Sequence, residues 1–160
     1  ILLSDSEEVI RASLDEVKKQ LTNLPRNEIA KLALQNSKAI RLDSIEECLD
    51  FSNEYAPEHL ILAIEYIDDY LDKVVNAGSV FLGNYSCESA GDYASGTNHT
   101  LPTNGYAKNH SGVSVDSFVK KITFQKLTKA GLNGIGKTIE LMAEAEGLLA
   151  HKNAVSIRIK

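Results

Sequence analysis

The stretch at residues 60–83, LILAIEYIDDYLDKVVNAGSVFLG, decides the fold class of this chain. It opens on LILAI, a continuous apolar run of strand length, and it closes on SVFLG, a second such run. Between them, residues 66–76 are typical of a helix that stops at Ala77 and Gly78. Because apolar strands without alternation are buried on both faces, the stretch predicts strands of a parallel sheet separated by a helix.

The same alternation of strand and helix fills the upstream residues. The predicted elements are a strand at 1–4, a helix capped by Asp5 or Ser6 that runs to Leu21, a helix opening at Pro25, a strand at 38–42 and a helix capped by Asp43 or Ser44. That last helix must end near Ala56, because Pro57 disfavours helix in the residue before it. We therefore expect an α/β domain over residues 1–115, with a mostly parallel sheet and helices on both faces.

Residues 84–115 differ in composition, since Ser, Gly, Asn, Thr, His and Tyr replace the apolar periodicity. A polar stretch of about thirty residues inside a compact domain is more often functional than idle. It follows the carboxyl end of the predicted strand at 79–83, where open α/β sheets bind ligands. After it, regular structure returns with a predicted strand at 122–127, a helix over about 130–149 and a short terminal segment at 155–160.

The motif GLNGIGKT at residues 131–138 satisfies the phosphate-loop pattern G-x-x-x-x-G-K-[ST]. A phosphate loop needs these residues in loop conformation with converging amides. However, Leu132, Ile135, Ile139 and Met142 form a helical stripe that begins inside the motif. Too few residues follow the motif for the strand and aspartate that hold magnesium downstream. We therefore expect a helix here, and a P-loop nucleotide-binding protein is the disfavoured alternative.

Composition limits the partners and the location of the protein. The net charge is −5 with both signs mixed along the chain, so no basic stripe exists for nucleic acid. No apolar run approaches the roughly 20 residues of a membrane span, and the first residues lack the charged and apolar regions typical of a signal peptide. The two cysteines, Cys48 and Cys87, favour neither a disulfide scaffold nor a metal pair, so a cytoplasmic location is expected. The abrupt opening on ILLS indicates that upstream sequence is missing.

Glu58 and His59 are adjacent at the boundary between a predicted helix and a predicted strand. Such a pair suits proton transfer, because histidine titrates near neutral pH and the pKa of a glutamate can be raised towards it. The alternative for an isolated pair is a solvated glutamate beside a capping histidine. The pair alone does not decide between the two.

Two further acid–histidine pairs carry side chains that zinc accepts as ligands. Asp92 and His99 lie in the polar stretch, and Glu146 and His151 lie on either side of Gly147, which would loosen the helix. Spacing alone does not identify a metal site, because the chain has no H-E-x-x-H motif and no cysteine pair.

Read together, several segments resemble the histidinol dehydrogenase family. The resemblance is carried by EYAPEHL at 54–60, AGSVFLG at 77–83, ESAGDYASGTNHTLPTNGYAK at 88–108, SGVSVDSFVKKITFQKLTKAGL at 111–132 and AEAEGLLAHKNAVSIR at 143–158. The central GDYASGTNHTLPT is long and specific to the family. The resemblance implies a Rossmann-like domain over 1–115, similar to half of an aldehyde dehydrogenase, and a small helical dimerisation arm over 116–160.

The resemblance also implies a zinc-dependent oxidation of L-histidinol through L-histidinal to L-histidine with two NAD⁺, in histidine biosynthesis. Glu58 matches the glutamate that activates water, and His59 matches the neighbouring acid/base that handles hydroxyl protons. Asp92 and His151 match zinc ligands. The residues that match substrate-binding positions are His59, Asp92, His99, Glu146 and His151.

The family's other two zinc ligands, a glutamine and a histidine, precede Ile1, and so does most of its NAD site. The isolated chain is therefore expected to be inactive, which keeps a non-catalytic dimerisation module as an alternative. The resemblance implies a homodimer in which Glu146 and His151 reach the partner's site. Cys87, where the family more often has proline, is interpreted as an incidental small side chain and not a thiol nucleophile. His110 is expected to be a solvent-facing loop residue.

Overall fold

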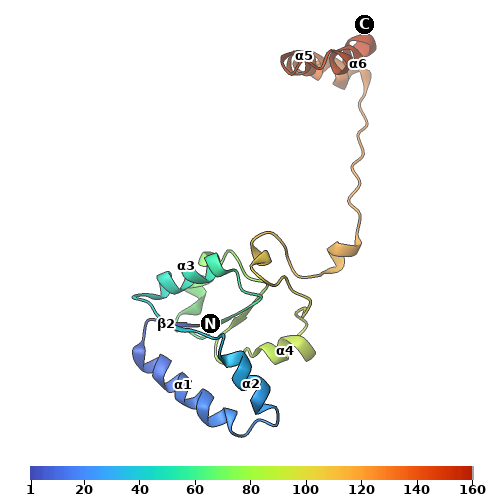
Figure 1. The fold of residues 1–160 in the computed structure, drawn as a ribbon. Coiled ribbons are helices and arrows are strands. Elements are labelled where there is room, and N and C mark those ends of the chain that lie inside the picture. The colour runs from blue at the N-terminus through green and yellow to red at the C-terminus, as the bar shows by residue number, and fades with distance from the viewer. Residues whose placement is uncertain (160) are drawn as a thin grey trace. The chain divides into compact units, whose positions relative to one another are not determined.

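The computed structural model describes residues 1–159 and divides into two compact units, of which the first ends at Phe118 and the second begins at Val119. The first unit contains all four strands and the helices α1 to α4, and the second contains α5 and α6 (Figure 1). Within residues 1–159, no helix is both long and apolar enough to cross a bilayer.

The first parallel pair comprises β1 (Leu2–Ser4) and β2 (Ala39–Arg41). The helices α1 (Glu7–Leu21) and α2 (Asn27–Leu34) connect the two strands. Ser6 caps α1, as predicted, by accepting a hydrogen bond from the Val9 amide at 3.3 Å. The order strand, helix, helix, strand is therefore confirmed over the first 41 residues.

The second parallel pair comprises β3 (His59–Leu62) and β4 (Ser79–Leu82). Helix α3 (Ile45–Tyr55) precedes it, capped by the Ser44 side chain. This helix ends where expected, because Ala56 adopts a left-handed conformation with φ of 52° immediately before Pro57. The parallel pairing predicted from residues 60–83 is confirmed.

The connection between β3 and β4 is a 3₁₀ helix, η1 (Ile67–Lys73), and not the longer helix predicted over 66–76. Asn53 on α3 explains the early end. Its side chain donates to the Lys73 carbonyl and accepts from the Val75 and Asn76 amides. These three bonds use the backbone groups that a continued helix would need, so the chain turns towards β4 after Lys73.

The four strands form two separate two-stranded sheets, so the single Rossmann-like sheet expected over 1–115 is not formed by the described residues. Hydrogen bonds to β2 and its flanks use Leu2 N–H and Ser4 C=O, which leaves the groups of Leu3 on the other edge of β1. That edge and β3 border one open cavity of about 930 Å³, lined mainly by residues 1–5 and 57–66 and by α3. No described strand pairs with this edge of β1 or joins it to β3, so the two pairs remain separate sheets.

The polar stretch contains more regular structure than expected. Helix α4 (Glu88–Tyr93) and the 3₁₀ helices η2 (Tyr106–Lys108) and η3 (Val115–Phe118) interrupt it. Gly91 on α4 has no room for a Cβ atom, which would lie 2.6 Å from Thr97 Oγ1 and 2.8 Å from Phe81 Cε1. Close packing of this glycine against β4 thus holds α4 in place.

The prediction of a strand over 122–127 is wrong, because these residues have no regular structure. A strand needs a hydrogen-bonded neighbour, and the described residues provide none here. Ile122 and Phe124 are accordingly 69% and 91% exposed.

Helix α5 (Lys129–Ala145) includes the whole GLNGIGKT motif, which confirms the predicted helix and excludes a phosphate loop in this conformation. The predicted end at Leu149 is too late. Gly147, with φ of 73°, donates to Glu144 C=O, and Leu148 N–H donates to Ala143 C=O, a Schellman motif that ends α5. The terminal segment then belongs to a further helix, α6 (Leu149–Ile159), which packs on α5 where Gly136 meets Ile159.

Candidate active site

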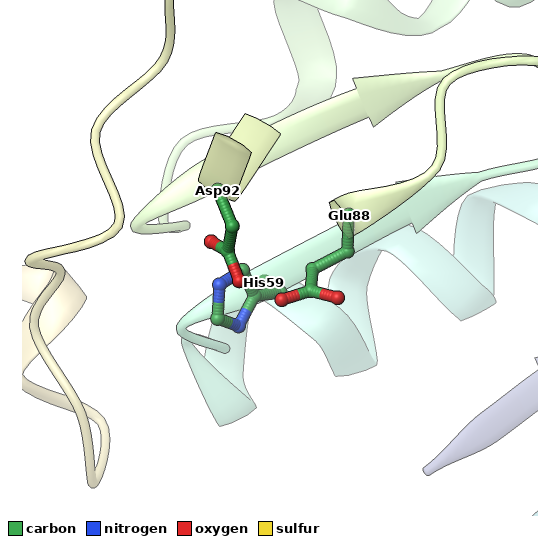
Figure 2. Close-up of side chains that lie close together, drawn as sticks. All are labelled: His59, Glu88 and Asp92. Atoms are coloured by element: carbon green, nitrogen blue, oxygen red, sulfur yellow. The ribbon is translucent and has the colours of Figure 1, made fainter. Parts of the chain in front are cut away.

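His59 is the first residue of β3, and its ring lies beside Phe81 on the neighbouring strand, with ring centroids 5.9 Å apart. The side chains of Glu88 and Asp92 approach the same ring from α4 (Figure 2). One nitrogen or oxygen atom from each of the three residues lies within 4.8 Å of those of the other two. We call His59, Glu88 and Asp92 the His59 cluster.

The position of the His59 cluster differs from the expected one. The polar stretch does leave the carboxyl end of β4, where a ligand site was predicted. Gly91 then packs on Phe81, and α4 carries its two carboxylates to the residue that begins β3. The cluster therefore lies at the amino end of β3, and not at the carboxyl end of a strand.

Electrostatics within the cluster are dominated by the two acids. The pKa of Glu88 is raised above its usual 4.5, first by a side-chain hydrogen bond with Asp92, then by the negative charge of Asp92 and by burial. The positive charge that His59 can carry acts in the opposite direction. Two carboxylates this close together repel each other, and a bound cation would relieve that repulsion.

Glu58 precedes the cluster and is fixed through its backbone. Ser79 N–H donates to Glu58 C=O at 2.9 Å, and Gly78 N–H donates to Pro57 C=O at 2.9 Å. A Cβ atom on Gly78 would lie 2.5 Å from the Glu58 oxygen, so only glycine permits this approach. Glu58 and His59 are both half-buried, and both line the open cavity of the first unit.

Of the predicted site residues in the first unit, the structure brings His59 and Asp92 together and keeps Glu58 adjacent. His99 is exposed and lies outside the His59 cluster. Glu88 was missed by sequence reasoning, although it lies four residues before Asp92. That spacing indicates a shared face only when both residues are helical, and the stretch was expected to be a loop.

The two predicted site residues of the second unit lie at the junction of its helices. Glu146 is the C-cap of α5, and the amide of His151, in the first turn of α6, donates to Leu148 C=O at 3.0 Å. Both side chains are exposed. Gly147 lies between the two residues and ends α5, in agreement with the prediction that it loosens the helix.

The two cysteines and His110 lie outside the His59 cluster. Cys48 is buried in α3, and burial raises the pKa of its thiol. Cys87 is the exposed N-cap residue of α4, without a side-chain capping bond. His110 is exposed, as expected, and its ring lies 5.9 Å from that of Tyr106.

An imidazole and two carboxylates on an α/β framework define a class of site suited to acid–base or metal-assisted chemistry. Comparison with known proteins is more specific. The sequence model of the family described as histidinol dehydrogenase matches residues 1–159. The chain therefore belongs to the histidinol dehydrogenase family.

The relatives agree with this assignment. Histidinol dehydrogenase of Bacteroides thetaiotaomicron is 55% identical over 159 residues, which cover 99% of this chain and 37% of that protein. The Yersinia pestis protein is 50% identical, with 99% and 36% covered. The crystal structure of histidinol dehydrogenase from Elizabethkingia anophelis matches with a TM-score of 0.94 and 66% identity, over 99% of this chain and 36% of that one. The chain thus spans little more than a third of the length of these relatives.

Proposed function

We propose that this chain forms part of the active site of a full-length, zinc-dependent histidinol dehydrogenase. The enzyme oxidises L-histidinol through L-histidinal to L-histidine, with two NAD⁺ as hydride acceptors, in the cytoplasm. The observation that carries the proposal is the convergence of His59 and Asp92, within a chain that belongs to this family. The 160 residues alone lack most of the NAD site and are inactive by themselves.

Glu58 and His59 perform the proton transfers. His59 accepts the hydroxyl proton of the alcohol as the first hydride leaves, and it returns and accepts protons in the later steps. Glu58 deprotonates the water that attacks the aldehyde-level carbon, and the resulting hydrate loses the second hydride. The half-buried positions of both side chains at one cavity support these roles, since each remains accessible to a ligand there.

Asp92 and His151 hold the zinc, together with a glutamine and a histidine outside this chain. The donor types fit zinc, which accepts imidazole nitrogen and carboxylate oxygen. Asp92 and Glu88 offer carboxylate oxygens within 4.8 Å of each other, and their mutual repulsion also favours a cation next to Asp92. When bound, zinc orients the imidazole and amino groups of histidinol and polarises its oxygen.

The remaining substrate contacts come from His99 and Glu146. His99 lines the substrate pocket, and Glu146 meets the polar end of the substrate. We further propose that the enzyme is a homodimer in which Glu146 and His151 act in the partner's active site. Their exposure at the end of α5 and the start of α6 supports this role, because both side chains are free to meet another subunit. Neither nucleic acid nor a membrane takes part.

The test measures NADH formation by the full-length enzyme and its variants, with histidinol and with histidinal as substrates. With histidinol as the substrate, Glu58→Gln should lower kcat by roughly 10²- to 10⁴-fold, the usual contribution of a general acid or base. Supplied with histidinal, Glu58→Gln should remain slow because its defect is in the aldehyde step, and His59→Asn should be slow with either substrate. Wild-type rates of NADH formation in both variants would overturn the assignment.

A further inference from the structure

Glu88 is the one member of the His59 cluster that has no place in the proposed chemistry. It is the first residue of α4, half-buried, and its side chain turns towards Asp92 and His59 (Figure 2). A glutamate in the first turn of a helix is ordinarily explained by its attraction to the helix dipole. That explanation does not account for the direction of the side chain.

The spacing makes the arrangement locally unfavourable. Glu88 and Asp92 are four residues apart on one helix, where like charges destabilise the helix. Helix α4 extends over only Glu88–Tyr93 and has no side-chain cap, so it has little stability of its own to offset that repulsion. The two acids therefore stay together for a reason outside the helix, and His59 is the group that both face.

From this geometry we propose that Glu88 is a positioning residue for both of its neighbours. A carboxyl oxygen of Glu88 lies within 4.8 Å both of a carboxyl oxygen of Asp92 and of a His59 ring nitrogen. Glu88 orients the Asp92 carboxylate towards the metal and holds the His59 ring in the orientation that proton transfer requires. A partner of this kind behind a metal-binding side chain typically contributes about 10- to 100-fold in metal affinity or activity. The inference rests on the proposed function.

The consequence for kinetics is specific. A positioning residue acts on the reacting groups and does not contact the substrate itself, so its loss should lower kcat and leave KM nearly unchanged. An aspartate at position 88 keeps the charge on a side chain shorter by one methylene, so it should restore part of the function. A merely structural residue would not produce this separation between Gln and Asp.

The experiment uses the full-length enzyme and three variants, Glu88→Gln, Glu88→Asp and the control Glu8→Gln. Glu8, like Glu88, is an acid in the first turn of a helix, but it is exposed and lies on α1, so it controls for the dipole effect. Zinc affinity is measured by competition with a chelator, and kcat and KM are measured with histidinol.

For Glu88→Gln, we expect zinc affinity and kcat each to fall about 10- to 100-fold, with KM within about twofold of wild type. Glu88→Asp should lie between this variant and wild type, and Glu8→Gln should match wild type. Unchanged zinc affinity and kcat in Glu88→Gln would overturn the role of Glu88, and so would equal losses in all three variants. If the Gln variant does not fold, the Asp variant decides by the same two measurements. A wild-type enzyme that lacks zinc or does not oxidise histidinol would instead refute the proposed function, which separates the two failures.

Discussion

Glu88 and Asp92 lie one helical turn apart on α4, and their carboxyl oxygens lie within 4.8 Å of each other and of a ring nitrogen of His59. The His59 cluster links α4, which follows β4, to the residue that begins β3. The site is therefore sensitive to the raised pKa of Glu88 and to any change that moves α4.

The first prediction concerns the stability of the metal-free enzyme. Folding raises the pKa of Glu88 above 4.5, so between pH 4.5 and the raised value the folded state binds more protons than the unfolded state. Stability contributed by this group is therefore lost as the pH rises through that window. In the presence of a chelator, the Tm of Glu88→Gln relative to wild type should increase as the pH rises from 4.5. A Tm difference that does not change with pH, or that changes in the opposite direction, would contradict the raised pKa of Glu88.

The second prediction tests how α4 is held. Gly91→Ala places a methyl group 2.6 Å from Thr97 Oγ1 and 2.8 Å from Phe81 Cε1, so α4 must shift away from β4. Overpacking of this kind costs about 1–3 kcal/mol of unfolding free energy. Chemical denaturation of the full-length enzyme measures it, and zinc affinity should fall as well, because α4 carries Asp92.

The matched control for this change is Gly134→Ala. Gly134 lies inside α5, and a Cβ atom there would meet nothing within 4 Å. Replacing glycine by alanine inside a helix should therefore stabilise the protein by about 0.5–1 kcal/mol. If the two alanine variants had the same effect on stability, the close packing of Gly91 would not be what holds α4.

Several elements of the fold are determined by residues close to them in the sequence. The parallel pairing of β3 with β4 and the end of α3 before Pro57 follow from local patterns, and both are confirmed. The helix through GLNGIGKT was predicted by its apolar stripe against a complete motif match. In each case the information lies within a few residues of the element.

The wrong or missed predictions concern features that depend on residues far away in the sequence. The segment 122–127 has a strand-like sequence but no hydrogen-bonded neighbour, and η1 is shortened by the distant side chain of Asn53. Helix α4 is too short to show periodicity and depends on the contact between Gly91 and Phe81. Glu88 could be linked to His59 only after α4 had been placed on β4. The presence or absence of tertiary contacts determined the outcome in all four cases, and a local sequence pattern does not contain that information.

The third prediction concerns Gly78, which lies against the backbone of Glu58. In Gly78→Ala, the added methyl group would lie 2.5 Å from the backbone carbonyl oxygen of Glu58. It would therefore displace the backbone that carries Glu58 and His59. We expect kcat of the full-length enzyme to fall by about 100-fold, the effect of a displacement of about 1 Å on positioned groups. Steady-state kinetics of NADH formation measures this, and a wild-type kcat would show that the position of this strand does not matter to the reaction.

The fourth prediction concerns the phosphate-loop motif. Because residues 131–138 are helical, their amides bond within α5 or to its N-cap residue Thr128 and cannot converge on a phosphate. Lys137→Ala should therefore leave stability within about 0.5 kcal/mol of wild type, as for other exposed positions. Isothermal titration with ATP and Mg²⁺ should detect no binding to this chain. Binding of ATP that Lys137→Ala abolishes would restore the nucleotide-binding alternative.

The central claim is that Asp92 and His151 hold the zinc of a histidinol dehydrogenase. The most direct measurement is the zinc content of the purified full-length enzyme and of its Asp92→Asn and His151→Asn variants, after dialysis against the same chelator. The proposal predicts one zinc per active site in the wild type, with large losses of zinc and of NADH formation in both variants. Undiminished zinc in both variants would contradict it.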